Sequence, residues 1–470
     1  MKEIMSARTT IRESLLRQGV NPYPQDGHRT HTNAMARELG VDELVQVAGR
    51  VTAIREHGNM RFFDIEDDTG KIQVVFKADQ LESKFQETSL YGVGDFIRTG
   101  GTRFDTKRGE KSVLALEFDM LSKAVNQIPD SWVGLKDEET RYRNRSLDML
   151  LNPEVKEVFR KRAAIVASVR STLNDHDFME VETPTLQPLY GGANARPFTT
   201  TINAWDMQMF LRISPELYLK RLMIGMGSSV YEIVKNFRNE GVDKTHNPEF
   251  TMMECYAPYQ DYTDMMRLTE QIYRNAALAA NGSTTVTFQG TTIDYARPWV
   301  RLPMKAGIKQ YLGLEVDTMT DYELKNAIVM FGEEYKGEWN RGLGIAKLAG
   351  AIEKCLIQPT FLMDMPKETT SLCKPHRDDP SLIERFEPYI MGMEIGNAYT
   401  ELNDPVLQRQ FWTNEMAEDP HPLDEDFLEA MQYGMPPAGG LGLGIDRMVM
   451  LLTDQTKIRD VITFPTMRRT

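Results

Sequence analysis

FRNEGVDKTHNPEFTMMECY, residues 237 to 256, holds the densest set of chemically specific side chains in this chain. Two short runs rich in apolar residues enclose a polar loop, which predicts an antiparallel pair of strands. Alternate residues of a strand share a face, so Arg238 and Glu240 can line one pocket, as can Glu254 and Tyr256. This density indicates a binding site. Its members include Arg238, Glu240, His246, Phe250 and Glu254.

Two later segments add matching chemistry. GGLGLGIDRM, residues 439 to 448, places Arg447 after a run of glycines, and ERFEPYIMGMEIGNAYTELND, residues 384 to 404, carries four glutamates and two asparagines. No GxxxxGK[ST] loop occurs, and GGLGLG lacks both the GxGxxG spacing and the βαβ context of a dinucleotide fold. Together the three segments predict a site for a nucleoside triphosphate, its metal ions and a cationic amino acid.

Composition indicates a cytoplasmic protein of ordinary globular type. The chain has 470 residues, 41% of them apolar, and a net charge of -13, which argues against a general nucleic-acid coat because phosphate contacts need Lys and Arg. No apolar run suits a membrane helix or a signal peptide, so no membrane partner is expected. The three scattered cysteines indicate a reducing compartment and lack zinc spacing.

The period of the sequence changes along the chain and predicts an α+β protein. Residues 1–46 form a helical lead-in, and 47–125 contain about five short strands with Gly and Asp turns, as in a small OB-type barrel. Residues 126–152 are a predicted linker. Residues 153–470 mix a long amphipathic helix, strands and further helices, with a helical insertion at about 301–355.

The whole length of the chain resembles class II lysyl-tRNA synthetases. The likeness rests on the barrel-like module, the long helix followed by a strand ending near Pro184, FRNEG with HNPEFT, and GLGIDR, in this order. It implies an N-terminal OB-type anticodon-binding barrel and a class II catalytic domain built on an antiparallel sheet flanked by helices. It also implies a homodimer whose interface includes Pro184.

The resemblance assigns roles at an ATP site. Arg238 would hold the α-phosphate and the amino-acid carboxylate, a task that suits a planar cationic fork. Glu240 would bind the adenine amino group, and Phe250 and Arg447 would enclose the ring. His246, with Asn247 beside it, would lie near the terminal phosphates. Arg238 and Arg447 are the predicted catalytic residues.

Glu387 and Glu394 are the predicted metal ligands. Mg²⁺ bound to ATP keeps several waters and takes one or two carboxylates together with phosphate oxygens. A pair of glutamates seven residues apart is not itself a metal spacing, and alone it would indicate solvated surface. The resemblance implies that these two hold Mg²⁺ with ATP as the substrate.

A lysine pocket needs carboxylates for the ammonium groups and aromatic rings for the aliphatic stem. By resemblance Glu216 binds the α-amino group and Gly192 lies against the substrate. Aspartate would be repelled by such acids. For each acid, the alternative is a buried ion pair with Lys or Arg. The predicted lysine-binding residues are Gly192, Glu216, Glu254, Tyr256, Asn397, Tyr399 and Glu401.

The barrel would read the anticodon, since aromatic rings stack on splayed bases and amides read their edges. The resemblance indicates Phe62, Gln73 and Glu110. A locally basic hairpin offers a phosphate contact; the alternative is solvated charge. Its basic residues are Arg103, Lys107, Arg108 and Lys111.

The resemblance implies ATP-dependent conversion of L-lysine to lysyl-adenylate and transfer of lysine to the 3′ end of tRNA(Lys). Two alternatives stay open. One is a ligase that lysylates a protein, although such enzymes lack the barrel. The other is a catalytically silent RNA-binding derivative, against which Arg238, Glu387, Glu394 and Arg447 argue.

Overall fold

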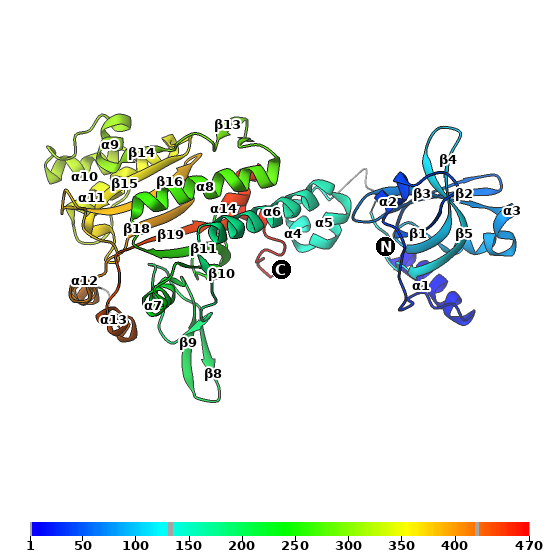
Figure 1. Ribbon diagram of the computed structural model, residues 1–470, viewed down its shortest axis with the longest axis horizontal. Coiled ribbons are helices and arrows are strands. Elements are labelled where there is room, and N and C mark those ends of the chain that lie inside the picture. The colour runs from blue at the N-terminus through cyan, green and yellow to red at the C-terminus, as the bar shows by residue number, and fades with distance from the viewer. Residues whose placement is uncertain (1, 130–134, 419–422, 470) are drawn as a thin grey trace. The chain divides into compact units, whose positions relative to one another are not determined.

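The computed structural model describes residues 2–129, 135–418 and 423–469. It contains two compact units, residues 1–136 and 137–470, each with its own sheet (Figure 1). The α+β class expected from the sequence is confirmed. Within the described ranges, no helix combines the length and apolar character that crossing a bilayer requires.

The first unit is a closed five-stranded barrel of order β1-β2-β3-β5-β4, as predicted. Inward residues such as Val47, Phe63 and Val74 alternate with outward ones and form its core. The predicted leading helix is also present, and Gly19 follows it at φ +76°. The elements are α1 (Lys2–Arg17), α2 (Asn33–Glu38), β1 (Leu44–His57), β2 (Met60–Glu66), β3 (Lys71–Lys77), α3 (Ala78–Leu81), β4 (Phe96–Asp105) and β5 (Lys111–Ser122).

The second unit is built on a nine-stranded sheet. Most neighbours are antiparallel, but β14 pairs with β15 and β10 with β6 in parallel, so the sheet is mixed and not wholly antiparallel as expected. The strand order is β14 (Val300–Pro303), β15 (Thr360–Pro366), β16 (Leu382–Ile390), β18 (Gly396–Thr400), β19 (Ala438–Gly444), β11 (Glu249–Pro258), β10 (Val230–Phe237) and β6 (Met179–Glu180), with β17 (Met393–Glu394) beside β16.

Three helices pack over one face of this sheet: α6 (Pro153–Asp175), α8 (Tyr262–Asn281) and α14 (Ile445–Leu452). Figure 1 shows α6 and α8 beside the strands. Pro153 begins α6 at a position where no amide hydrogen is needed. A capping box at Asp261 begins α8, and Gly282 ends it in the left-handed region.

The second unit begins at residue 137, within the predicted 126–152 linker, of which residues 130–134 lie outside the described residues. Helices α4 (Glu138–Arg143) and α5 (Arg145–Leu151) belong to it. Arg145 is buried, pairs with Asp148, and donates hydrogen bonds to the carbonyls of Arg459 and Thr463. Charged side chains of this segment are thus paired inside the fold, although in the sequence they resemble those of a polar linker.

The opposite face of the sheet carries α7 (Glu216–Met226) and a small sheet of order β7-β9-β8. The predicted insertion is helical and has its own apolar core with the strand edge at β15 and β16. The small sheet consists of β7 (Leu186–Gln187), β8 (Thr199–Ile202) and β9 (Met207–Leu211), and the helices of the insertion are α9 (Met304–Leu312), α10 (Asp321–Met330) and α11 (Arg341–Ala349). The remaining elements of the second unit are the hairpin of β12 (Thr285–Phe288) and β13 (Thr291–Asp294), and the helices α12 (Pro405–Glu418), α13 (Glu425–Gln432) and α15 (Ile458–Val461).

Candidate active site

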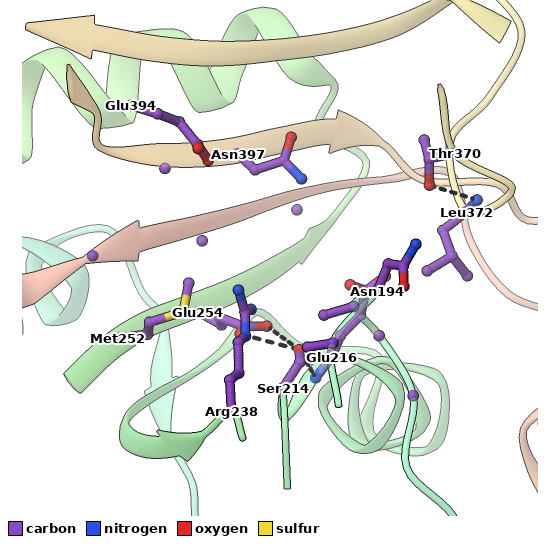
Figure 2. Close-up of a pocket in the computed structure, with 18 of the residues that line it drawn as sticks. Asn194, Ser214, Glu216, Arg238, Met252, Glu254, Thr370, Leu372, Glu394 and Asn397 are labelled. Carbon is purple, nitrogen blue, oxygen red and sulfur yellow. Dashed lines mark hydrogen bonds between the residues drawn. The ribbon is translucent and has the colours of Figure 1, made fainter. Parts of the chain in front are cut away.

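A cavity of about 830 Å³ lies on the face of the sheet opposite α8. Strands β11, β18 and β19 form its floor, and α7, residues 190–195 and residues 368–372 form its walls. Figure 2 shows Arg238, Glu254 and Glu216 on one side and Glu394 and Asn397 across from them. The volume suits a ligand of several hundred daltons.

Strand alternation separates the cavity from the core. On β11, Met253 and Cys255 pack in the apolar core, whereas Glu254 and Tyr256 line the cavity. The same period places Asn397 and Tyr399 of β18 in the cavity. Glu254 and Tyr256 therefore share the cavity face of β11, as the sequence predicted, and Asn397 and Tyr399 share that of β18.

The glycines of β19 give this floor its depth. A Cβ on Gly440 would lie 1.9 Å from Glu401 Oε1 and 2.6 Å from the Tyr256 ring, so only glycine fits. The glycine-rich stretch thus makes room for other side chains. Gly192 has a similar constraint, because its φ is +80° and a Cβ there would lie 2.8 Å from Glu216 Cβ.

Glu216 and Glu254 line the buried end of the cavity and are each 4% exposed. Ser214 links them: its hydroxyl lies 3.1 Å from both Glu254 oxygens and accepts a hydrogen bond from the Glu216 amide. Tyr256 donates its hydroxyl hydrogen to Glu254 Oε2 at 3.3 Å. Burial, with repulsion from Glu216, raises the pKa of Glu254 to about 7.

Glu401 lies behind this floor and is absent from the cavity lining. It is completely buried, and its Oε2 is 2.5 Å from Lys220 Nζ. Lys220 Nζ is also 2.7 Å from Glu216 Oε1. The buried ion pair considered as an alternative for each acid is thus present for Glu216 and Glu401. Sequence analysis missed Lys220 because it appears as one cation in an amphipathic helix.

Arg238 faces the cavity from the end of β10. Its guanidinium lies 5.2 Å from the centre of the Phe250 ring, and none of the described residues accepts a hydrogen bond from its buried Nε. Glu240 also lines the cavity, where its Oε1 accepts a hydrogen bond from the Arg196 amide at 3.2 Å. Arg238, Glu240 and Phe250 thus come together as expected.

At the exposed end, His246 lies between Asp243 and Arg447. Its Nδ1 is 2.9 Å from Asp243, and its Nε2 is 3.2 Å from Arg447 Nη2. Burial would raise the pKa of Asp243, but hydrogen bonds from the Thr245 amide and from His246 outweigh it and lower the pKa to about 2. Arg447 also donates to the Glu394 carbonyl at 2.5 Å. Because Asp243 is ionised and lies beside Nδ1, it orients the imidazole ring of His246.

Asn247, together with Asn397 and Tyr399 of β18, also lines the cavity. Asn247 is 5% exposed and donates its amide hydrogen to the Glu249 carbonyl at 2.6 Å. Asn397 accepts a hydrogen bond from Arg385 Nε at 3.0 Å and is hydrogen-bonded to the Tyr399 hydroxyl. Arg385, which sequence analysis did not select, holds Asn397 in place.

The two predicted metal ligands line different hollows. Glu394 lines the main cavity, whereas Glu387 lines a neighbouring hollow of about 440 Å³ and pairs with Arg385 at 2.7 Å. Burial and the repulsion of Glu387 raise the pKa of Glu394. Among the described residues there is no cluster of three acidic, His or Cys side chains suited to a metal.

On the barrel, Phe62 and Gln73 share the outer face. Their strands pair in register, and the neighbours Phe63 and Val74 are buried in the core. Ser112 donates its hydroxyl to Gln73 Oε1 and lies 3.1 Å from the carbonyl of Glu110, which is exposed at the hairpin turn. Ser112 thus links Gln73 and Glu110, and Phe62 shares the outer face with Gln73.

The basic hairpin differs from the expectation at one position. Arg103 is only 2% exposed and pairs with Asp105 at 2.7 Å. It has the inward parity of Ile97 on β4, so it cannot offer a surface phosphate contact. Lys107 and Arg108 in the turn are exposed.

Comparison with known proteins agrees with this geometry. A family described as "tRNA synthetases class II (D, K and N)" matches residues 137–468, and an OB-fold nucleic acid binding domain matches residues 45–121. The lysine–tRNA ligase of Roseiflexus castenholzii is 46% identical, covering 100% of this chain and 99% of the relative. That of Clostridium novyi is 44% identical, covering 97% and 93%. The chain belongs to the lysine–tRNA ligase family of class II tRNA synthetases, as the sequence predicted.

Proposed function

We propose that this chain activates L-lysine with ATP and transfers the lysyl group to the 3′ end of tRNA(Lys). The observation that supports it best is the buried acidic end of a cavity that also contains Arg238. Lysine carries two ammonium groups and one carboxylate, and this arrangement offers partners of opposite charge to all three. Full-length relatives named lysine–tRNA ligase support the same activity.

In the first step, a carboxylate oxygen of lysine forms a bond to the α-phosphorus of ATP, and the bond from that phosphorus to the bridging oxygen of pyrophosphate breaks. In the second step, a terminal ribose hydroxyl oxygen of tRNA forms a bond to the lysyl carbonyl carbon, and the bond from that carbon to the phosphate oxygen of AMP breaks. The hydroxyl proton passes to the departing phosphate or to solvent. No protein nucleophile is required. Arg238 orients the carboxylate and stabilises charge on the α-phosphate, so catalysis is positioning and electrostatic stabilisation.

Glu394 and Glu387 fit a role in holding Mg²⁺. Burial first, and then repulsion from Glu387, raise the pKa of Glu394, and a bound cation would counter both. Mg²⁺ is commonly bound by one or two carboxylates plus substrate phosphates, so a larger protein cluster is not needed. When bound, the ion would neutralise phosphate charge.

The nucleotide end would hold ATP between Phe250 and Arg447, with Glu240 at the adenine amino group. Asn247 and His246 would lie near the phosphates. All five line the same cavity, which supports the assignment.

The barrel would bind the anticodon through Phe62, Gln73 and Glu110. We also propose a cytoplasmic homodimer. Pro184 is exposed near the edge strand β6, and Met179 and Leu186 beside it are exposed apolar residues, which supports an interface there.

A pyrophosphate-exchange screen over the twenty amino acids, followed by charging of total tRNA, tests the proposal. We expect lysine alone to drive exchange and tRNA(Lys) alone to be charged. Exchange driven by another amino acid would contradict the substrate assignment. Exchange without charging would favour ligation to a protein, and absence of both would favour a silent RNA-binding derivative.

A further inference from the structure

Lys220 is a buried cation next to the acidic end of the cavity but outside its lining, and the proposed reaction leaves its role open. It lies on α7, one turn after Glu216, and is 1% exposed. Its Nζ contacts Glu216 Oε1 at 2.7 Å and Glu401 Oε2 at 2.5 Å, and lies 5.6 Å from the centre of the Tyr256 ring. A buried Lys this well paired stays charged, because two carboxylates compensate its loss of hydration.

Glu401, one of the two carboxylates paired with Lys220, has a second oxygen that lacks a partner in the described part of the chain. None of the described residues donates a hydrogen bond to Glu401 Oε1, although Glu401 is completely buried. That oxygen lies against Gly440, which lines the cavity. A buried carboxylate oxygen without a donor is costly, so its position beside the cavity points to a ligand donor.

The balance of charge supports this assignment. Glu216, Glu254 and Glu401 are buried carboxylates within one group, and Lys220 is the cation bonded to two of them. Burial raises the pKa of Glu254 and of Glu401 above the ordinary carboxyl range, and Lys220 opposes that shift at Glu401. The two ammonium groups of L-lysine would favour the ionised forms of these carboxylates. A pocket without Lys220 would bring three carboxylates together, and they would take up protons or move apart.

We propose that Lys220 is a positioning residue: it clamps Glu216 and Glu401 so that Glu401 Oε1 meets the ε-ammonium of the substrate. The inference rests on the proposed lysine activation. Lys220 contacts the protein carboxylates and not the reacting atoms. By holding Glu401 in place it contributes to the selection of lysine over an amino acid that has the same carbon chain but no ammonium group at its end.

Lys220→Met in the full-length enzyme tests this role, with lysine-dependent pyrophosphate exchange as the measurement. We expect KM for lysine to rise at least about tenfold, the loss of roughly one charge-assisted hydrogen bond. KM for ATP and kcat at saturating lysine should stay within about twofold. The preference for L-lysine over L-norleucine, measured by competition, should fall by a similar factor. Lys220→Gln, which can still donate a hydrogen bond, should lie between the wild type and Lys220→Met.

Lys123→Met is the matched control, because Lys123 is also buried and pairs with buried Asp95, but in the barrel unit. It should leave the lysine KM of exchange unchanged. An unchanged lysine KM and norleucine preference in Lys220→Met would overturn the proposal. Equal loss of lysine and ATP binding in both Lys220 variants would also overturn it, since that marks a purely structural pair. If the wild-type enzyme itself shows no lysine-dependent exchange, the proposed function fails first.

Discussion

The buried, acidic end of the cavity and the end predicted to hold ATP differ in how far their side chains are shielded from solvent. At the acidic end, Glu216, Glu254 and Glu401 are at most 4% exposed and are joined by Ser214 and Lys220. At the other end, Glu240 and His246 are exposed. Charged groups held in fixed positions let a pocket distinguish one amino-acid side chain from another. The binding of a triphosphate depends less on such fixed groups, because the ligand itself carries several charges.

Arg238 lies where the two ends meet, so its loss should have the largest effect. Arg238→Ala should lower the rate of pyrophosphate exchange by about 10³-fold, since removing one preorganised donor to a transition state costs 10²–10³ and this side chain offers several. Single-turnover adenylate formation measures it. A loss below about tenfold would mean that the two ends do not share this residue.

Glu254→Gln should separate the two ends. It removes a buried charge beside the substrate while keeping shape, so KM for lysine should rise about 30-fold, near 2 kcal/mol. KM for ATP should stay within about twofold. Steady-state exchange at varied lysine and varied ATP gives both constants, and a parallel rise would contradict the separation.

The pH dependence should also differ between the ends. The pKa of Glu254 is raised to about 7, mainly by burial, and the substrate ammonium favours its ionised form. Burial likewise raises the pKa of Glu401, to about 8. Lysine binding should therefore weaken as the pH falls below about 8 and weaken further below 7, by up to about tenfold per unit for each carboxyl, and should level off above 8. KM for ATP at saturating lysine should not follow this curve. A lysine KM that stays constant from pH 5.5 to 8 would show that the charge of Glu254 acts on neither ammonium group of the substrate.

His246→Ala should have the smallest effect, because the side chain is exposed. KM for ATP should rise about three- to tenfold, with the lysine KM unchanged. Asp243→Asn should give a weaker change in the same direction, since it loosens the ring without removing it. An effect on lysine rather than on ATP would reverse the assignment of this end.

Much of the site could be predicted, because strand alternation and motif order set which residues share a face. Glu254 with Tyr256, and Asn397 with Tyr399, line the cavity for that reason. Family membership and the barrel were likewise predictable.

Other features depend on tertiary packing that no local pattern encodes. The Lys220 contact with Glu401 joins residues 181 positions apart across the sheet. Arg103 looked like an exposed cation in a basic hairpin, but its parity on β4 turns it inward. The role of Arg385 depends on strand neighbours that only the sheet order reveals.

A crystal structure of the enzyme with bound L-lysine would show whether buried carboxylates select the substrate. The account predicts the ε-ammonium within hydrogen-bonding distance of Glu401 Oε1, the α-ammonium at Glu216, and the carboxylate at Arg238. An ε-ammonium left in solvent, or directed at Lys220 or Arg385, would contradict it.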